Sequence, residues 1–173
     1  MKTIKKTGSA VALVLLLLSA SAAPSAAQAP RSAGLPAASA TAQQNRQVVN
    51  RFYEAVESQQ FAVIKDVFLP NARQLIPYAP PGFPKRLEGS EAIYQQFSGL
   101  TAYFGRMRFP RQIFVTEDPD FLFVKFNGDM EVKSGGKYEN EYVGTFRLKD
   151  GKIVEYVEYF NPLVMARAFN IKL

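Results

Sequence analysis

The second half of the chain alternates apolar and polar residues with a period of two, and this pattern constrains the fold more than any other feature. Between Leu122 and Lys133 apolar side chains face one side and largely charged ones the other. Glycine-containing turns at 134–137 and 149–151 connect this segment to two more segments of the same kind, 138–148 and 152–160. The sequence therefore predicts an antiparallel meander of long strands.

The first half of the chain instead predicts helices. Thr41 can cap a first helix, with Gln44 completing a capping box, and apolar residues follow at helical spacing from Val48 to Val56. A second apolar stripe begins at 61 and ends before Pro70, a strand is predicted at 72–78, and Ser90 caps a third helix. Three helices on one face of a curved antiparallel sheet make an α+β domain.

The first residues predict an export signal. Lys2, Lys5 and Lys6 precede an uncharged apolar run that is shorter than the roughly 20 residues needed to span a bilayer, and small residues follow it. We predict a signal peptide at 1–22, with cleavage as late as 29, a flexible leader at 23–40 and a single domain at 41–173. The mature protein is then periplasmic or secreted and has no stable membrane anchor.

Composition excludes several functions. Of the formal net charge of +6, three units come from the lysines of the signal, and the remaining +3 makes no case for nucleic acid. The chain has no cysteine and no histidine, so we expect no transition-metal site and no cofactor. The apolar core must stabilise the fold without disulfides.

The turn at 149–151 decides which side chains share a face. A type I turn with Gly151 in the left-handed region pairs Leu148 with Lys152, whereas a two-residue Asp-Gly turn shifts the pairing by one. The first register separates two sets of side chains, and we prefer it for that reason. It groups Glu139, Glu141, Val143, Thr145, Val157, Tyr159 and Asn161 against Tyr142, Phe146, Val154, Tyr156 and Phe160. The second set is apolar enough to predict a homodimer interface on the sheet.

Several short motifs resemble the phenazine-biosynthesis A/B proteins and the broader SnoaL-like, nuclear-transport-factor-2-like superfamily. The resemblance runs from about 44 to 169. Its motifs are 87–93, 112–119, Tyr138-Glu139-Asn140, 150–153, Glu158 and Asn161-Pro162. It implies a cone-shaped curved sheet of about six strands, with the three helices on its concave face, a short C-terminal helix and an apolar pocket between them.

The resemblance also implies a chemistry for Glu139. In the phenazine-biosynthesis A/B proteins, the glutamate of the motif that matches Tyr138-Glu139-Asn140 acts as an acid/base together with a histidine on the third helix. Here the histidine is absent and the segment reads Tyr94-Gln95-Gln96-Phe97, in which a glutamine could position a ligand. We predict Glu139 as the catalytic residue, because a carboxylate facing an apolar pocket has a raised pKa. A solvated hairpin glutamate is the structural alternative.

The other candidates carry hydroxyl, amide, charged or aromatic groups near the expected pocket. They are Tyr53, Arg73, Tyr78, Tyr94, Gln96, Phe97, Glu141 and Tyr159. Tyr78 with Phe83 predicts a lid in a proline-rich segment, for which a rigid connector is the alternative. Tyrosines in an apolar stripe also serve simply as core residues.

Three functions remain open from the sequence. The first is acid/base chemistry, such as isomerisation, dehydration or condensation, on a small cyclic or aromatic compound. The second is an exported module that binds a small organic ligand without turnover. The third is a structural dimerisation module. Fold class alone does not choose among them.

Overall fold

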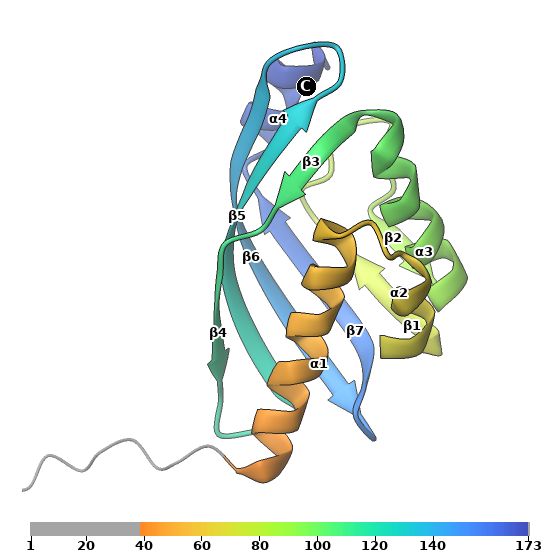
Figure 1. Ribbon diagram of the computed structural model, residues 1–173, viewed down its shortest axis with the longest axis vertical. Coiled ribbons are helices and arrows are strands. Elements are labelled where there is room, and N and C mark those ends of the chain that lie inside the picture. The colour runs from red at the N-terminus through yellow and green to blue at the C-terminus, as the bar shows by residue number, and fades with distance from the viewer. Residues whose placement is uncertain (1–38, 173) are drawn as a thin grey trace, which may run out of the picture. The chain divides into compact units, whose positions relative to one another are not determined.

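The computed structural model describes residues 39–172, and Figure 1 shows helices lying against one side of a curved sheet. The predicted signal peptide lies outside the described residues, as does nearly all of the predicted leader, and both stay predictions. Within the described residues, no helix combines the length and apolar character needed to cross a membrane.

The described residues form five helical elements and seven strands. The helices are α1 (Ala40–Glu57), α2 (Ala62–Val67), α3 (Ser90–Gly99), the 3-10 helix η1 (Leu100–Ala102) and α4 (Pro162–Phe169). The strands are β1 (Phe68–Leu75), β2 (Arg86–Glu88), β3 (Phe104–Arg108), β4 (Arg111–Val115), β5 (Phe121–Val132), β6 (Lys137–Lys149) and β7 (Lys152–Phe160). The predicted α+β class, the curved sheet, the three N-terminal helices and the C-terminal helix are confirmed.

The sheet is mixed, which corrects the antiparallel prediction. Its strand order is β2-β1-β7-β6-β5-β3, with β4 pairing with β5 beside this path. β1 runs parallel to β7, because a helix and the whole meander separate the two strands in the chain and allow a crossover between them. β1 also begins earlier than predicted, at Phe68. It tolerates Pro70 because its register with β7 shifts between Phe68 and Arg73, where no regular ladder bond is required.

Two helix caps also differ from the prediction. Ser39 caps α1, because its side chain accepts a hydrogen bond from the Ala42 N–H at 3.2 Å, so the cap lies two residues before Thr41. Gly89 occupies the cap position of α3 without a side-chain bond, and Ser90 is the first helical residue.

The hairpin between β6 and β7 has the two-residue Asp-Gly turn and not the preferred type I turn, which corrects the prediction. Asp150 and Gly151 both have positive φ, and Lys149 pairs with Lys152, which defines a two-residue turn. A bulge then leaves Val154 without a partner, so the predicted separation of the two sets holds from Glu155 onward, whereas Ile153 is buried in place of Val154. Phe146 consequently pairs with Tyr156.

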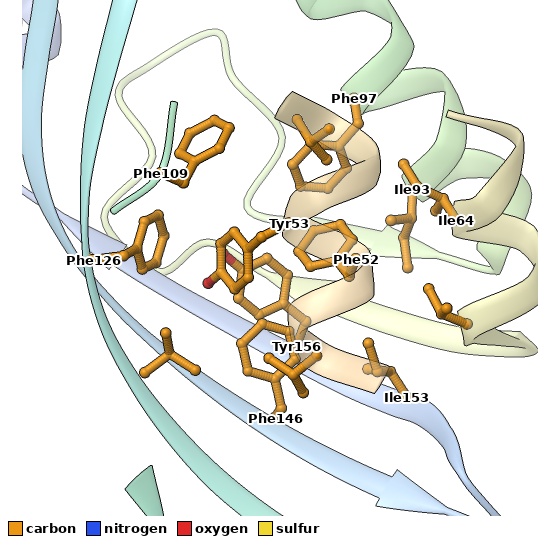
Figure 2. Packing of buried hydrophobic residues seen from close by; sticks show 14 of the residues in the cluster. Phe52, Tyr53, Ile64, Ile93, Phe97, Phe109, Phe126, Phe146, Ile153 and Tyr156 are labelled. Carbon is orange, nitrogen blue, oxygen red and sulfur yellow. The ribbon is translucent and has the colours of Figure 1, made fainter. Parts of the chain in front are cut away.

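The aromatic set on these strands forms the core of the domain. Phe146 and Tyr156 stack with ring centroids 4.4 Å apart, and Phe52 of α1 packs edge-on against Tyr156 at 5.6 Å (Figure 2). Tyr142, Phe146 and Tyr156 are buried within the monomer. The prediction that this face forms a subunit interface is therefore wrong, because helices already cover it.

Candidate functional site

An apolar cavity of about 540 Å³ lies on the inner face of the sheet. The sheet contributes its inner side chains, α3 and η1 form one wall, and α4 with its following residues forms another. Ala79, Pro80, Phe83 and Pro84 of the proline-rich segment complete the lining. Ten aromatic side chains of the described residues line the cavity, namely Phe83, Phe97, Tyr103, Phe104, Phe109, Phe126, Tyr138, Tyr142, Phe160 and Phe169. This size and composition are typical of a pocket for a small organic ligand.

Glu158 is the carboxylate of this cavity. Alternation along β7 places it on the inner face between Tyr156 and Phe160, where the partly buried residue lines the cavity. Burial raises the pKa of Glu158 to about 7, and the hydrogen bond that the Tyr156 hydroxyl donates to Glu158 Oε2 opposes part of this rise. Glu158 is therefore able to exchange a proton near neutral pH.

Gly144 makes room for the side chain of Tyr156, whose hydroxyl donates a hydrogen bond to Glu158. It pairs directly with Glu158 across β6 and β7. A Cβ atom at this position would lie 3.1 Å from the Tyr156 ring and 3.3 Å from the Tyr53 hydroxyl. Figure 2 shows the two tyrosine rings beside each other. The Tyr53 hydroxyl is buried and makes no hydrogen bond of normal geometry, although Tyr156 lies close enough to influence its pKa. Any larger residue at 144 would displace this pair.

A second polar group in the cavity is a pair of tyrosine hydroxyls. The orientation of the Asn140 amide follows from two backbone contacts, because its Oδ1 accepts from the Glu141 N–H at 2.9 Å and its Nδ2 donates to the Asn161 carbonyl at 3.0 Å. The same Nδ2 donates to the Tyr138 oxygen at 2.9 Å, and the Tyr138 and Tyr142 oxygens lie 3.1 Å apart.

One of the two phenolic hydrogens occupies the bond between these tyrosines, and the other remains available to a ligand. Burial raises the pKa of both Tyr138 and Tyr142, so both stay protonated donors at neutral pH.

Gln74 of β1 contributes a third polar group. Its side chain is 1% exposed, lines the cavity, and has an Oε1 without a hydrogen bond to any described residue. It pairs with Tyr156 in the β1–β7 ladder, which puts it on the same inner face as Glu158. A buried amide without a partner is rare in folded proteins and marks a place where a ligand can bind.

Comparison with known proteins agrees with this architecture. Residues 49–156 match the family model of the SnoaL-like domain. The chain belongs to the SnoaL-like domain family. An uncharacterised PhzA/B-like protein of Pseudomonas aeruginosa is 37% identical over 103 residues, which are 57% of this chain and 70% of that protein.

Two crystal structures resemble this SnoaL-like domain closely. A candidate isomerase from Bacillus subtilis has a TM-score of 0.70 and 26% identity, over 77% of this chain and 97% of that one. The phenazine biosynthesis-related protein PhzB2 of P. aeruginosa has a TM-score of 0.69 and 21% identity, over 81% of this chain and 89% of that one. The resemblance to PhzA/B-like proteins that the motifs indicated is confirmed.

Glu139 does not lie where the sequence predicted. In this SnoaL-like domain it points away from the helices on the outer face of β6, where its side chain is 67% exposed and its nearest cation is the Lys137 Nζ at 3.8 Å. Glu141 is exposed on the same face, and Tyr159 contacts Tyr78 there with ring centroids 5.7 Å apart. The prediction that these residues face the pocket is wrong, because alternation separates the two faces and cannot tell which one the helices cover.

The remaining predicted residues divide in two groups. Gln96 and Phe97 of α3 line the cavity, and their role in binding a ligand stays a prediction. Tyr53 packs in the core next to the site, whereas Tyr94 lies beneath the Lys65 Nζ, which is 4.2 Å from its ring centroid. Arg73 forms an ion pair with Glu155 on the outer face. None of these last three lines the cavity.

Of the two aromatic residues predicted to form a lid in the proline-rich segment, only one lines the cavity. Tyr78 is exposed, whereas Phe83 lines the cavity. The sequence did contain a signal for Glu158, because alternation along β7 places this carboxylate within the apolar set, between Tyr156 and Phe160. A charged residue inside an apolar stripe marks a functional site more strongly than one in a polar stripe.

Proposed function

We propose that this SnoaL-like domain catalyses a proton transfer, of the isomerase type, on a small cyclic compound, with Glu158 as the general base and acid. The observation that carries this proposal is the placement of one carboxylate, with a pKa of about 7, in a cavity with largely aromatic walls. The 26% identity to the candidate isomerase from B. subtilis supports the same class of reaction.

Glu158 and the Tyr138–Tyr142 pair each have a role in this reaction. The Glu158 carboxylate removes a proton from the carbon next to a carbonyl group. The electron pair of the broken C–H bond then forms the carbon–carbon double bond of an enolate. The free phenolic hydrogen of the Tyr138–Tyr142 pair donates to the enolate oxygen, whose charge develops only as the reaction proceeds. The Glu158 carboxylic acid then returns the proton to the same carbon or to another carbon of the conjugated system.

The experiment follows hydrogen–deuterium exchange at the α-carbons of 2-tetralone in D2O by NMR. This neutral bicyclic ketone needs only the two steps above, and solvent deuterium replaces the abstracted proton. We expect the protein to accelerate exchange, with a rate that rises with pH around a midpoint near 7. Glu158→Gln should lower the enzymatic rate by about a hundredfold or more.

Glu139→Gln is the matched control, because it makes the same chemical change on the outer face of the sheet. It should leave the exchange rate unchanged. If Glu158→Gln exchanges 2-tetralone as fast as the unaltered protein, Glu158 is not the base and the proposal fails.

Binding without turnover is the second candidate function. It is favoured by one observation: Glu158 is the only carboxylate that lines the cavity in the described part of the chain, and the chain has no histidine to share the proton transfer. In that case 2-tetralone binds, with exchange no faster than in buffer.

We also propose that the homodimer forms through the outer face of the sheet. Phe114 and Phe123 are exposed there, with ring centroids 6.1 Å apart, and paired exposed aromatics of this kind favour association. Phe123→Glu should convert a dimer to a monomer in light scattering. Tyr103→Glu, an exposed aromatic at the cavity, should not.

A further inference from the structure

The charges around the cavity restrict the ligand. Glu158 carries the cavity's one carboxylate, and within the described residues no lysine or arginine lines the cavity. A ligand carboxylate would therefore lose its hydration and meet another negative charge without a cation to compensate. The cavity consequently disfavours anions whatever their size.

The register of the sheet fixes the relative positions of the three polar groups that the strands contribute to the cavity. β7 lies between β1 and β6, so Gln74 of β1 and the tyrosine pair of β6 lie on opposite sides of Glu158. Gln74 pairs with Tyr156, two residues before Glu158, while Tyr142 pairs with Phe160, two residues after it. The proton-transfer group thus lies between two hydrogen-bonding positions.

The amide of Gln74 is the position that the reaction above does not use. Its residue is 1% exposed, and its Oε1 is buried without a hydrogen-bond partner among the described residues. Left unpaired, such a group destabilises the folded protein, so a ligand that pairs with it gains affinity. An amide offers one acceptor and a donor side by side, which suits a hydroxyl or a carbonyl oxygen.

From these observations we propose that the cavity selects an uncharged cyclic compound with oxygen groups at both ends, one bound by the tyrosine pair and the other by Gln74, and that it excludes carboxylates. This inference rests on the proposed function for the position of the reacting carbon, but its test does not require turnover.

Three naphthalene derivatives serve as probes. 2-Naphthol carries one hydroxyl, 2,6-dihydroxynaphthalene carries one at each end, and 6-hydroxy-2-naphthoate replaces one of these by a carboxylate. Titration calorimetry with the unaltered protein at pH 7.5 should show that the dihydroxy compound binds about tenfold more tightly than 2-naphthol, the effect of about one further hydrogen bond. The naphthoate should bind at least about tenfold more weakly than the dihydroxy compound.

Two variants assign these differences to residues. Gln74→Leu removes the amide with little change in volume, and should abolish the advantage of the dihydroxy compound while leaving 2-naphthol binding within about threefold. Gln74→Met repeats the test with an unbranched side chain. Agreement between the two variants shows that the effect comes from loss of the amide and not from altered packing in Gln74→Leu. Gln112→Leu is the control, because it replaces an exposed glutamine on β4 away from the cavity.

Three results would overturn the inference. They are equal affinity of the unaltered protein for the dihydroxy compound and the naphthoate, an unchanged advantage of the dihydroxy compound in both Gln74 variants, and no binding of any neutral probe at its solubility limit. Failure of the proposed function is a separate result, seen as 2-tetralone exchange that does not depend on Glu158.

Discussion

The two faces of β6 and β7 carry different chemistry although the same strands build both. On the inner face, Tyr138, Tyr142, Phe146 and Tyr156 are buried beneath helices and around the cavity. The outer face alternates with them and carries exposed charges such as Glu139. The difference shows that period-two alternation sorts the side chains of a strand, while the helices packed on the sheet decide which set becomes the site.

Two glutamates make the comparison specific. Glu139 lies in solvent near a lysine, whereas Glu158 lies in a cavity with aromatic walls and accepts a hydrogen bond from Tyr156. Burial raises the pKa of Glu158 to about 7. The same residue type is thus a surface charge on one face and a proton-transfer group on the other, because only one of them loses its hydration.

The largest expected difference between the faces is in packing. Phe146→Ala should lower the free energy of unfolding by about 3 to 5 kcal/mol, because it leaves a cavity between the rings of Phe52 and Tyr156. Thr145→Ala, one residue away on the outer face, should cost less than about 1 kcal/mol. Urea unfolding of both variants measures these values, and equal losses would contradict the assignment of the faces.

The next difference concerns the pH dependence of stability. Because the folded-state pKa of Glu158 lies above the ordinary value of 4.5, its ionisation destabilises the fold as the pH rises from about 4.5 to 7. Glu158→Gln should therefore stabilise the protein at pH 8 by up to about 3 kcal/mol relative to its effect at pH 4.

Glu139→Gln tests the outer face in the same way. It should change the free energy of unfolding by less than about 0.5 kcal/mol at pH 4 and at pH 8. Urea unfolding at the two pH values provides the comparison. If Glu158→Gln shows no more pH dependence than Glu139→Gln, the environments of the two glutamates do not differ as described.

A smaller effect is expected at Gln74. Replacing this buried amide, whose Oε1 has no partner among the described residues, by leucine should raise the free energy of unfolding by about 1 kcal/mol, because an apolar side chain carries no desolvation cost there. Thermal unfolding without ligand measures the gain. A loss of stability would mean that the amide has a partner in solution and is not held for a ligand.

The sequence predicted those parts of the fold that depend on local patterns. Helical spacing, the glycines of two hairpins and alternation along β5 to β7 predicted the α+β class and the order of elements. Two features could not be predicted in this way. The parallel pairing of β1 with β7 joins segments that lie far apart in the chain, and the side of the sheet covered by α1 is a matter of tertiary packing.

The candidate site was predicted only in part for the same reason. Gln96 and Phe97 on α3 were placed correctly, whereas the acid/base role was assigned to Glu139 on the face that solvent covers. α4 and the segment at 79–84 also line the cavity, and no local pattern indicates that they meet there. Glu158 was within reach of the sequence argument, since it interrupts the apolar set that includes Tyr156 and Phe160.

The most direct test of the central contrast is a carboxyl titration. Carbon-13 NMR of protein labelled at the glutamate side-chain carboxyls, followed from pH 3 to pH 9, reports the protonation of each glutamate. We expect one resonance with a midpoint near 7 that disappears in Glu158→Gln and persists in Glu139→Gln. A spectrum in which no glutamate titrates near 7, or in which that resonance is lost in Glu139→Gln, would contradict the assignment of Glu158 as the proton-transfer group.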